Sequence, residues 1–195
     1  MLKESNPAHT QKALDDLLDQ IAGELYNLAS MLVGEGEESA RLVETAIGAA
    51  GISLCKDSAE ARAKSRKELS GAAIAILGKR GPNSLVAPEG LAPVETCLDD
   101  DDLNSSGVSR EDLEHVISGP ERGRVKNWLA GLPVAVRAIF VLRAVAGLSA
   151  AETADLLADH GGAQAAGWTE DAVREIFRRG LCSLASQLLH ATATR

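Results

Sequence analysis

Side chains that could carry catalysis or bind a metal are scattered along this chain of 195 residues. Cys55, Cys97 and Cys182 form no Cys-x-x-Cys pair, and the histidines are equally dispersed, at His9, His115, His160 and His190. Zinc sites need ligands at close, paired spacings, and disulfide frameworks usually use an even number of cysteines. Neither is indicated, so each cysteine is expected to be a packed thiol, either buried or half-buried. No nucleophile–base pair or phosphate loop is visible, so we expect no enzyme, metal or cofactor.

Arginines near the end of the chain are the most informative polar residues. Arg174 and Arg178 are four residues apart and would share one face of a helix, with Arg179 next to them. Such a face can contact phosphates or guanine edges in a major groove. The alternative is a solvated basic face on a helical bundle.

The net charge of −8 is unevenly distributed. Residues 1–55 carry net −6, residues 56–80 net +4, residues 81–121 net −9 and residues 122–195 net +3. Because phosphate contacts depend on charge within about 10 Å, the two weakly basic blocks leave nucleic-acid binding possible.

Composition and periodicity predict an all-α fold. The chain is 45% hydrophobic but only 3% aromatic, and its core residues are mostly good helix formers. Leucine and isoleucine recur at three- and four-residue steps over Thr10–Val33, which predicts a first helix. Helices over Glu37–Leu54, with Leu42 and Val43 inward, and over Ser58–Gly78 complete a small N-terminal bundle in residues 1–80.

Residues 81–121 are predicted to form a flexible acidic linker. They contain several prolines and glycines and the run Asp99–Asp102, a composition that buries little surface. The alternative for the Asp run is an acidic segment that lies in a basic nucleic-acid channel. A short helix over Arg110–Ile117 is expected near the end of the linker.

The last part, residues 122–195, has helix-start and capping residues at the spacing expected of a helix-turn-helix domain. Pro133 begins a helix over Val134–Ala146. Ser149 and Glu152 form a capping box for a helix over Ala150–Ala158. Thr169 is the N-cap candidate of the last helix, Glu170–Ala191, which carries the arginines.

This C-terminal part resembles region 4 of the extracytoplasmic-function sigma factors of bacterial RNA polymerase. The matching residues are the Leu-Pro-Val-Ala-Val-Arg-Ala-Ile-Phe-Val-Leu-Arg run at 132–143, Gly-Leu-Ser at 147–149 and Glu-Thr-Ala at 152–154. The resemblance implies that Thr169–Leu184 is similar to the family's recognition helix, which contacts the upstream promoter element. Its DNA-contact residues would be Thr169, Arg174, Arg178 and Arg179.

The N-terminal part is similar to region 2 of the same family, through Leu-Tyr-Asn-Leu-Ala at 25–29, Leu-Val-Gly at 32–34 and the segment around Leu-Val-Glu at 42–44. The resemblance implies that Leu42, Val43 and Glu44 contact core RNA polymerase. Arg62, Arg66 and Lys67 would face the DNA backbone. The expected function is therefore a sigma-like transcription protein that binds polymerase and promoter DNA, with an anti-sigma factor as a possible partner.

Three departures from the family pattern support a different function. No aromatic residue occurs between Tyr26 and Trp128 to stack on flipped bases. Ala40-Arg41 replaces the usual acidic residues. Ten residues, Ala158–Gly167, separate Leu157 from Trp168, where the family has one or two. The alternative is a degenerate adaptor or decoy that binds an anti-sigma factor or polymerase without melting DNA. Because the chain shows neither a signal-peptide pattern nor a long apolar run, we expect a cytoplasmic protein with no membrane partner.

Overall fold

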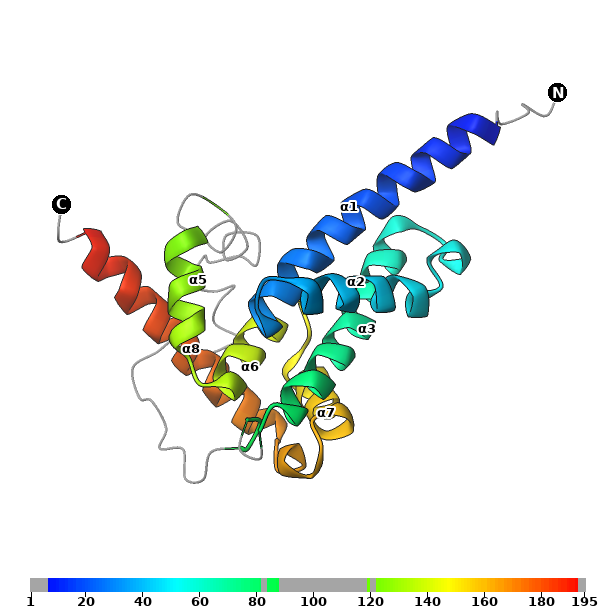
Figure 1. Cartoon of the computed structure of the whole chain (residues 1–195). Coiled ribbons are helices and arrows are strands. Elements are labelled where there is room, and N and C mark those ends of the chain that lie inside the picture. Colours follow the sequence, from blue (N-terminus) through cyan, green and yellow to red (C-terminus); the bar gives the residue numbers. More distant parts are fainter. Residues whose placement is uncertain (1–6, 82–83, 88–118, 120–121, 193–195) are drawn as a thin grey trace. The chain divides into compact units, whose positions relative to one another are not determined.

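The computed structural model describes residues 7–81, 84–87, 119 and 122–192 of the chain. Within these residues the regular structure is entirely helical, which confirms the all-α prediction (Figure 1). The helices are α1 (Pro7–Val33), α2 (Glu37–Ala50), α3 (Ser58–Lys79), α5 (Arg122–Gly131), α6 (Val134–Ala144), α7 (Ala150–His160) and α8 (Glu170–Thr192), with short 3₁₀ turns η1 (Ile52–Leu54) and η3 (Ala163–Ala165). The predicted helix over Arg110–Ile117 and the Asp99–Asp102 run lie outside the described residues.

The second helix ends earlier than its sequence pattern predicts. Gly51 adopts φ 57 and ψ 46, the left-handed conformation that ends many helices, and η1 follows it. A hydrophobic pattern that continues into Ile52 and Leu54 therefore does not mean that the helix continues. The side chain of Leu54 is 85% exposed at this corner.

The chain forms two compact units, Met1–Leu69 and Ser70–Arg195. In the first unit α1 packs against α2, and both helices contribute leucines to the core. The core residues of these helices and of the first half of α3 include Ile21, Leu25, Leu28, Leu32, Leu42, Val43, Ala46, Ala61 and Leu69. Ser39, which is also buried, donates a hydrogen bond to the carbonyl oxygen of Gly34 and so holds the corner between α1 and α2.

The second unit begins inside α3, and the last part of this helix contacts the end of α7 and the turn that follows it. Its core is built on Phe140 of α6 and Phe177 of α8, whose ring centroids are 5.6 Å apart. Trp128 of α5 meets the Phe140 ring edge-on at 4.9 Å. Gly180 allows α8 to approach α6 closely, because a Cβ atom there would lie 2.7 Å from Phe140 Cδ2.

One described cysteine agrees with the expectation of a packed thiol and one does not. Cys55 is a free, partly buried thiol, whereas Cys182 is disulfide-bonded. Cys97 lies outside the described residues. The expectation for Cys182 was wrong because cysteine spacing along the sequence carries no information about distances created by folding. No group of three or more potential metal ligands occurs among the described residues. None of the helices in the described ranges combines the length and the apolar character that crossing a membrane requires.

Candidate nucleic-acid interface

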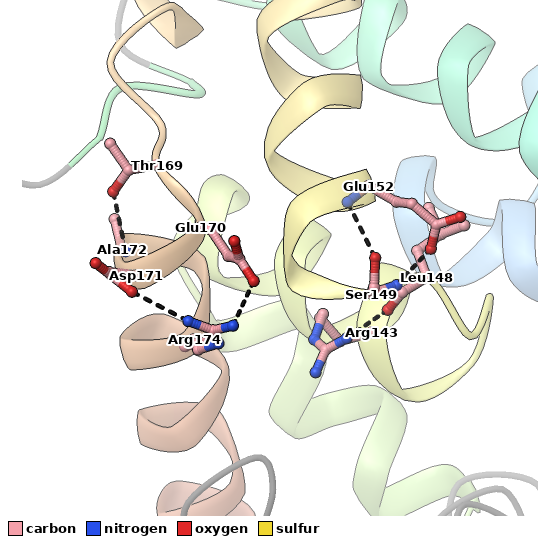
Figure 2. Close-up of polar contacts among 9 residues, drawn as sticks. All are labelled: Arg143, Leu148, Ser149, Glu152, Thr169, Glu170, Asp171, Ala172 and Arg174. Carbon is pink, nitrogen blue, oxygen red and sulfur yellow. Dashed lines mark hydrogen bonds and ion pairs between the residues drawn. The ribbon is translucent and has the colours of Figure 1, made fainter.

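The corner between α6 and α7 is fixed by the capping box that the sequence predicts. Ser149 Oγ accepts a hydrogen bond from the Glu152 amide at 3.1 Å, and Glu152 Oε2 accepts one from the Ser149 amide at 2.8 Å (Figure 2). Arg143 Nη1 donates to the carbonyl oxygen of Leu148 at 2.6 Å. These bonds determine where α7 begins relative to α6.

Arg143 is a structural residue as well as a basic one. Its guanidinium lies 5.1 Å from the centroid of the Phe177 ring, an arrangement typical of a cation–π contact. Burial lowers the pKa of Arg143, and the nearby charge of Arg174 lowers it further. The side chain therefore connects the end of α6 to α8 at the expense of part of its hydration.

The start of α8 holds two of the four residues that were predicted to contact DNA, Thr169 as the N-cap and Arg174 in the second turn. Thr169 Oγ1 accepts a hydrogen bond from the Ala172 amide at 3.2 Å, as an N-cap does. Arg174 forms ion pairs with Glu170 and, at 3.1 Å, with Asp171 (Figure 2). The Arg174 side chain is 43% exposed, so a ligand can reach it.

Arg178 and Arg179 both bind one carboxylate, that of Glu175. Arg178 hydrogen-bonds to Glu175 Oε2, and Arg179 Nε donates to Glu175 Oε1 at 2.9 Å. The Glu175 side chain is only 12% exposed. Burial raises the pKa of Glu175, but the hydrogen bonds from the two arginines outweigh it and leave the pKa below its ordinary value. These ion pairs reduce the positive field of α8 and fix the arginine side chains.

The predicted basic residues of α3 are also engaged. Glu24 of α1 binds Arg62 Nε at 3.3 Å and Arg66 Nη2 at 3.1 Å, so this carboxylate joins α1 to α3. Lys67 is exposed on the same helix. Of these three candidates for contact with the DNA backbone, Arg62 and Arg66 join α3 to α1, and Lys67 lies at the surface.

The predicted polymerase contacts are divided between core and surface. Leu42 and Val43 are buried, which agrees with the inward positions that helix periodicity predicts for them. Glu44 is exposed on α2, near Arg41 and Glu37, which form an ion pair at 3.1 Å. A partner of α2 would meet Glu44 and Arg41 rather than the two apolar residues.

Sequence reasoning did not identify Glu24 and Glu175 as the partners of the basic residues. The spacing of Glu175 and Arg179, four residues apart, was a readable signal for an ion pair within a helix. Glu24 and Arg66 are 42 residues apart, and nothing local connects them.

Comparison with known proteins leaves the family unassigned. No family model matches the chain, and neither a curated protein nor a solved structure matches it significantly.

Proposed function

We propose that this protein binds duplex DNA through α8 as part of transcription initiation or its regulation, in the manner of a sigma factor. The observation that supports the proposal best is the first two turns of α8. They carry a half-exposed arginine, Arg174, on a helix whose start is capped by Thr169 and whose buried side packs on α6 through Phe177 and Gly180. A helix held in this way can present one face to a major groove.

The ion pairs on α8 are compatible with this function. Exposed pairs within a helix contribute only about 0–1 kcal/mol each, so phosphate or base contacts can replace those of Arg174. Arg178 and Arg179 are less available, because both side chains are less exposed than that of Arg174 and both bind the largely buried carboxylate of Glu175. Arg174 is therefore the side chain that we propose for base contact, and the other two position the helix.

Selection of duplexes from a random pool by the full chain, followed by anisotropy titration, tests the proposal. Arg174→Ala is expected to lower the affinity for the selected duplex by about fivefold or more, which corresponds to the range of about 1–3 kcal/mol typical of a base-reading contact. Arg41→Ala is the matched control, since Arg41 forms the same kind of pair four residues along a helix but lies on α2. No selected duplex, or equal losses for both variants, would exclude base reading by α8.

A second candidate is an adaptor that binds polymerase or an anti-sigma factor without opening promoter DNA. The specific observation in its favour is the Glu24 carboxylate, which occupies both Arg62 and Arg66. Run-off transcription with core RNA polymerase separates the candidates. A promoter-dependent product favours a sigma factor, whereas co-purification with polymerase and no product from any selected promoter favours the adaptor.

A further inference from the structure

A segment of four residues that follows α3 lies against the long turn between α7 and α8, residues 161–169. We call residues 84–87 the strap. Leu85 is fully buried, and its carbonyl oxygen accepts a hydrogen bond from Trp168 Nε1 at 2.8 Å. Ser84 Oγ donates to the carbonyl oxygen of Leu77 at 2.7 Å, which fixes the start of the strap to α3.

The turn contacts α3 and the strap along most of its length. Gln164 Nε2 donates to the carbonyl oxygen of Gly78 at 2.8 Å. Gly78 and Gly161 are so close that a Cβ atom on Gly78 would lie 2.6 Å from the Gly161 carbonyl oxygen. A Cβ atom on Gly161 would in turn lie 3.4 Å from Leu85 Cδ1. The turn is thus held by groups about 80 residues earlier in the chain, within the same compact unit.

Trp168 connects these contacts to α8. It is 5% exposed and directly precedes Thr169, the N-cap of α8. The first turn of α8 depends on Thr169, which accepts the amides of Ala172 and Val173 through its side chain and its carbonyl oxygen. A two-residue turn would fix the angle between α7 and α8 by its own geometry. The longer turn at 161–169 constrains this angle much less by itself, so it needs contacts with other parts of the chain.

We propose that the strap positions the first turn of α8, so that DNA binding by α8 requires the strap to be seated on Trp168. Leu85 and Trp168 are then positioning residues, since they act on DNA through Thr169 and Arg174. The effect of the strap on DNA affinity rests on the proposed DNA-binding function. The contact of the strap with Trp168 and the order of the first turn of α8 can be measured without DNA.

Leu85→Ala in the full chain tests this role, in a Trp128→Phe background that leaves Trp168 as the only tryptophan. We expect the Trp168 emission to shift to longer wavelength and to become more accessible to acrylamide. Affinity for the selected duplex should fall at least fivefold, the lower range of typical couplings between two sites. Trp168→Phe, which removes the indole N–H but keeps an aromatic ring, should lower the affinity in the same direction.

Leu129→Ala is the matched control, because Leu129 is an equally buried leucine on α5. Both leucine variants should lower the thermal unfolding midpoint, but only Leu85→Ala should change Trp168 emission and duplex affinity. Equal losses of affinity in the two variants would show a general effect of stability and would overturn the proposal.

Hydrogen exchange distinguishes the strap from the proposed function. The amides of Ala172 and Val173 should exchange faster in Leu85→Ala than in Leu129→Ala. If the wild-type chain selects no duplex, the proposed function fails, and exchange alone decides whether the strap orders α8. Unchanged exchange in Leu85→Ala would overturn the strap whether or not DNA binds.

Discussion

At the residue scale, the guanidinium of Arg174 lies between two carboxylates of its own helix. Glu170 and Asp171 hold it in place, but they also place two negative charges where a phosphate or base would approach. The proposed DNA binding would therefore exchange an intrahelical pair for an intermolecular one. The net gain is smaller than an unpaired arginine would provide, and this favours contacts that depend on base sequence over contacts that depend on charge alone.

Glu170→Gln should raise duplex affinity. The change removes one pairing carboxylate from Arg174 and one negative charge from the proposed interface. We expect an increase of up to about fivefold in an anisotropy titration at low salt, which corresponds to the upper value of about 1 kcal/mol for an exposed pair. Glu37→Gln on α2 removes the same charge from a matching pair with Arg41 and should leave the affinity nearly unchanged. Equal increases in both variants would mean that only the net charge matters.

Glu175 makes the stability of α8 dependent on pH. Its pKa is lowered in the folded chain, because the hydrogen bonds from Arg178 and Arg179 outweigh the effect of burial, which raises it. A carboxylate of this kind stabilises the fold above its unfolded pKa of about 4.3, and the contribution is lost as the pH falls through the lower folded pKa. Glu175→Gln should therefore be less stable than wild type at pH 7, and the difference should shrink toward pH 3.

Denaturant unfolding of both proteins between pH 7 and pH 3 measures this difference. Glu44→Gln, on the exposed face of α2, serves as the control for the loss of one negative charge and should leave the stability at pH 7 nearly unchanged. A Glu175→Gln deficit that stays constant down to pH 3 would mean that side-chain shape rather than charge is responsible.

At the element scale, the packing of α8 on α6 depends on one glycine. A Cβ atom at Gly180 would lie 2.7 Å from Phe140 Cδ2, so Gly180→Ala must displace the central ring of the second unit. We expect a loss of about 1–3 kcal/mol in the free energy of unfolding, the range typical of overpacked cores. Gly123→Ala on α5 is the matched control: nothing lies within 4 Å of its Cβ position, and alanine favours the helix. A Gly180→Ala variant as stable as wild type in urea would contradict this packing.

Helix starts were predictable from the sequence, because the signals are local. Pro133 precedes α6, and Ser149 with Glu152 forms the capping box of α7. The end of α2 at Gly51 was missed, because apolar residues continue past the glycine and periodicity does not report a left-handed backbone. The form of the turn at 161–169 could not be predicted either, since its partners, Gly78 and Leu85, lie about 80 residues away in the sequence.

At the scale of the whole molecule, the boundary between the two compact units falls inside α3, between Leu69 and Ser70. The sequence suggested a domain end near residue 80, because glycine and proline first gather there. Glycine and proline indicate where a helix ends, whereas the boundary of a compact unit depends on which residues each part of the helix packs against. Leu77, on the last part of α3, and Leu85 are both fully buried within the second unit.

This boundary predicts which fragments are stable. A fragment of residues 70–195 keeps Leu77 and Leu85, whereas a fragment of residues 122–195 loses both. Loss of each buried leucine side chain costs about 2–5 kcal/mol, and total stabilities of such domains are about 5–15 kcal/mol. We therefore expect the 70–195 fragment to unfold cooperatively on heating, and the 122–195 fragment to be marginally stable or unfolded by circular dichroism at the same temperature.

A third fragment separates the contribution of the strap from that of the last part of α3. Residues 81–195 retain the strap but lack the last part of α3, which carries the carbonyl oxygens of Leu77 and Gly78 that bind Ser84 and Gln164. Its midpoint should lie between those of the other two fragments, because Leu85 can still cover Gly161 and Trp168 but is no longer anchored at its start. If residues 122–195 alone were as stable as residues 70–195, helices α5–α8 would be independent of α3, and the unit boundary would be near residue 122.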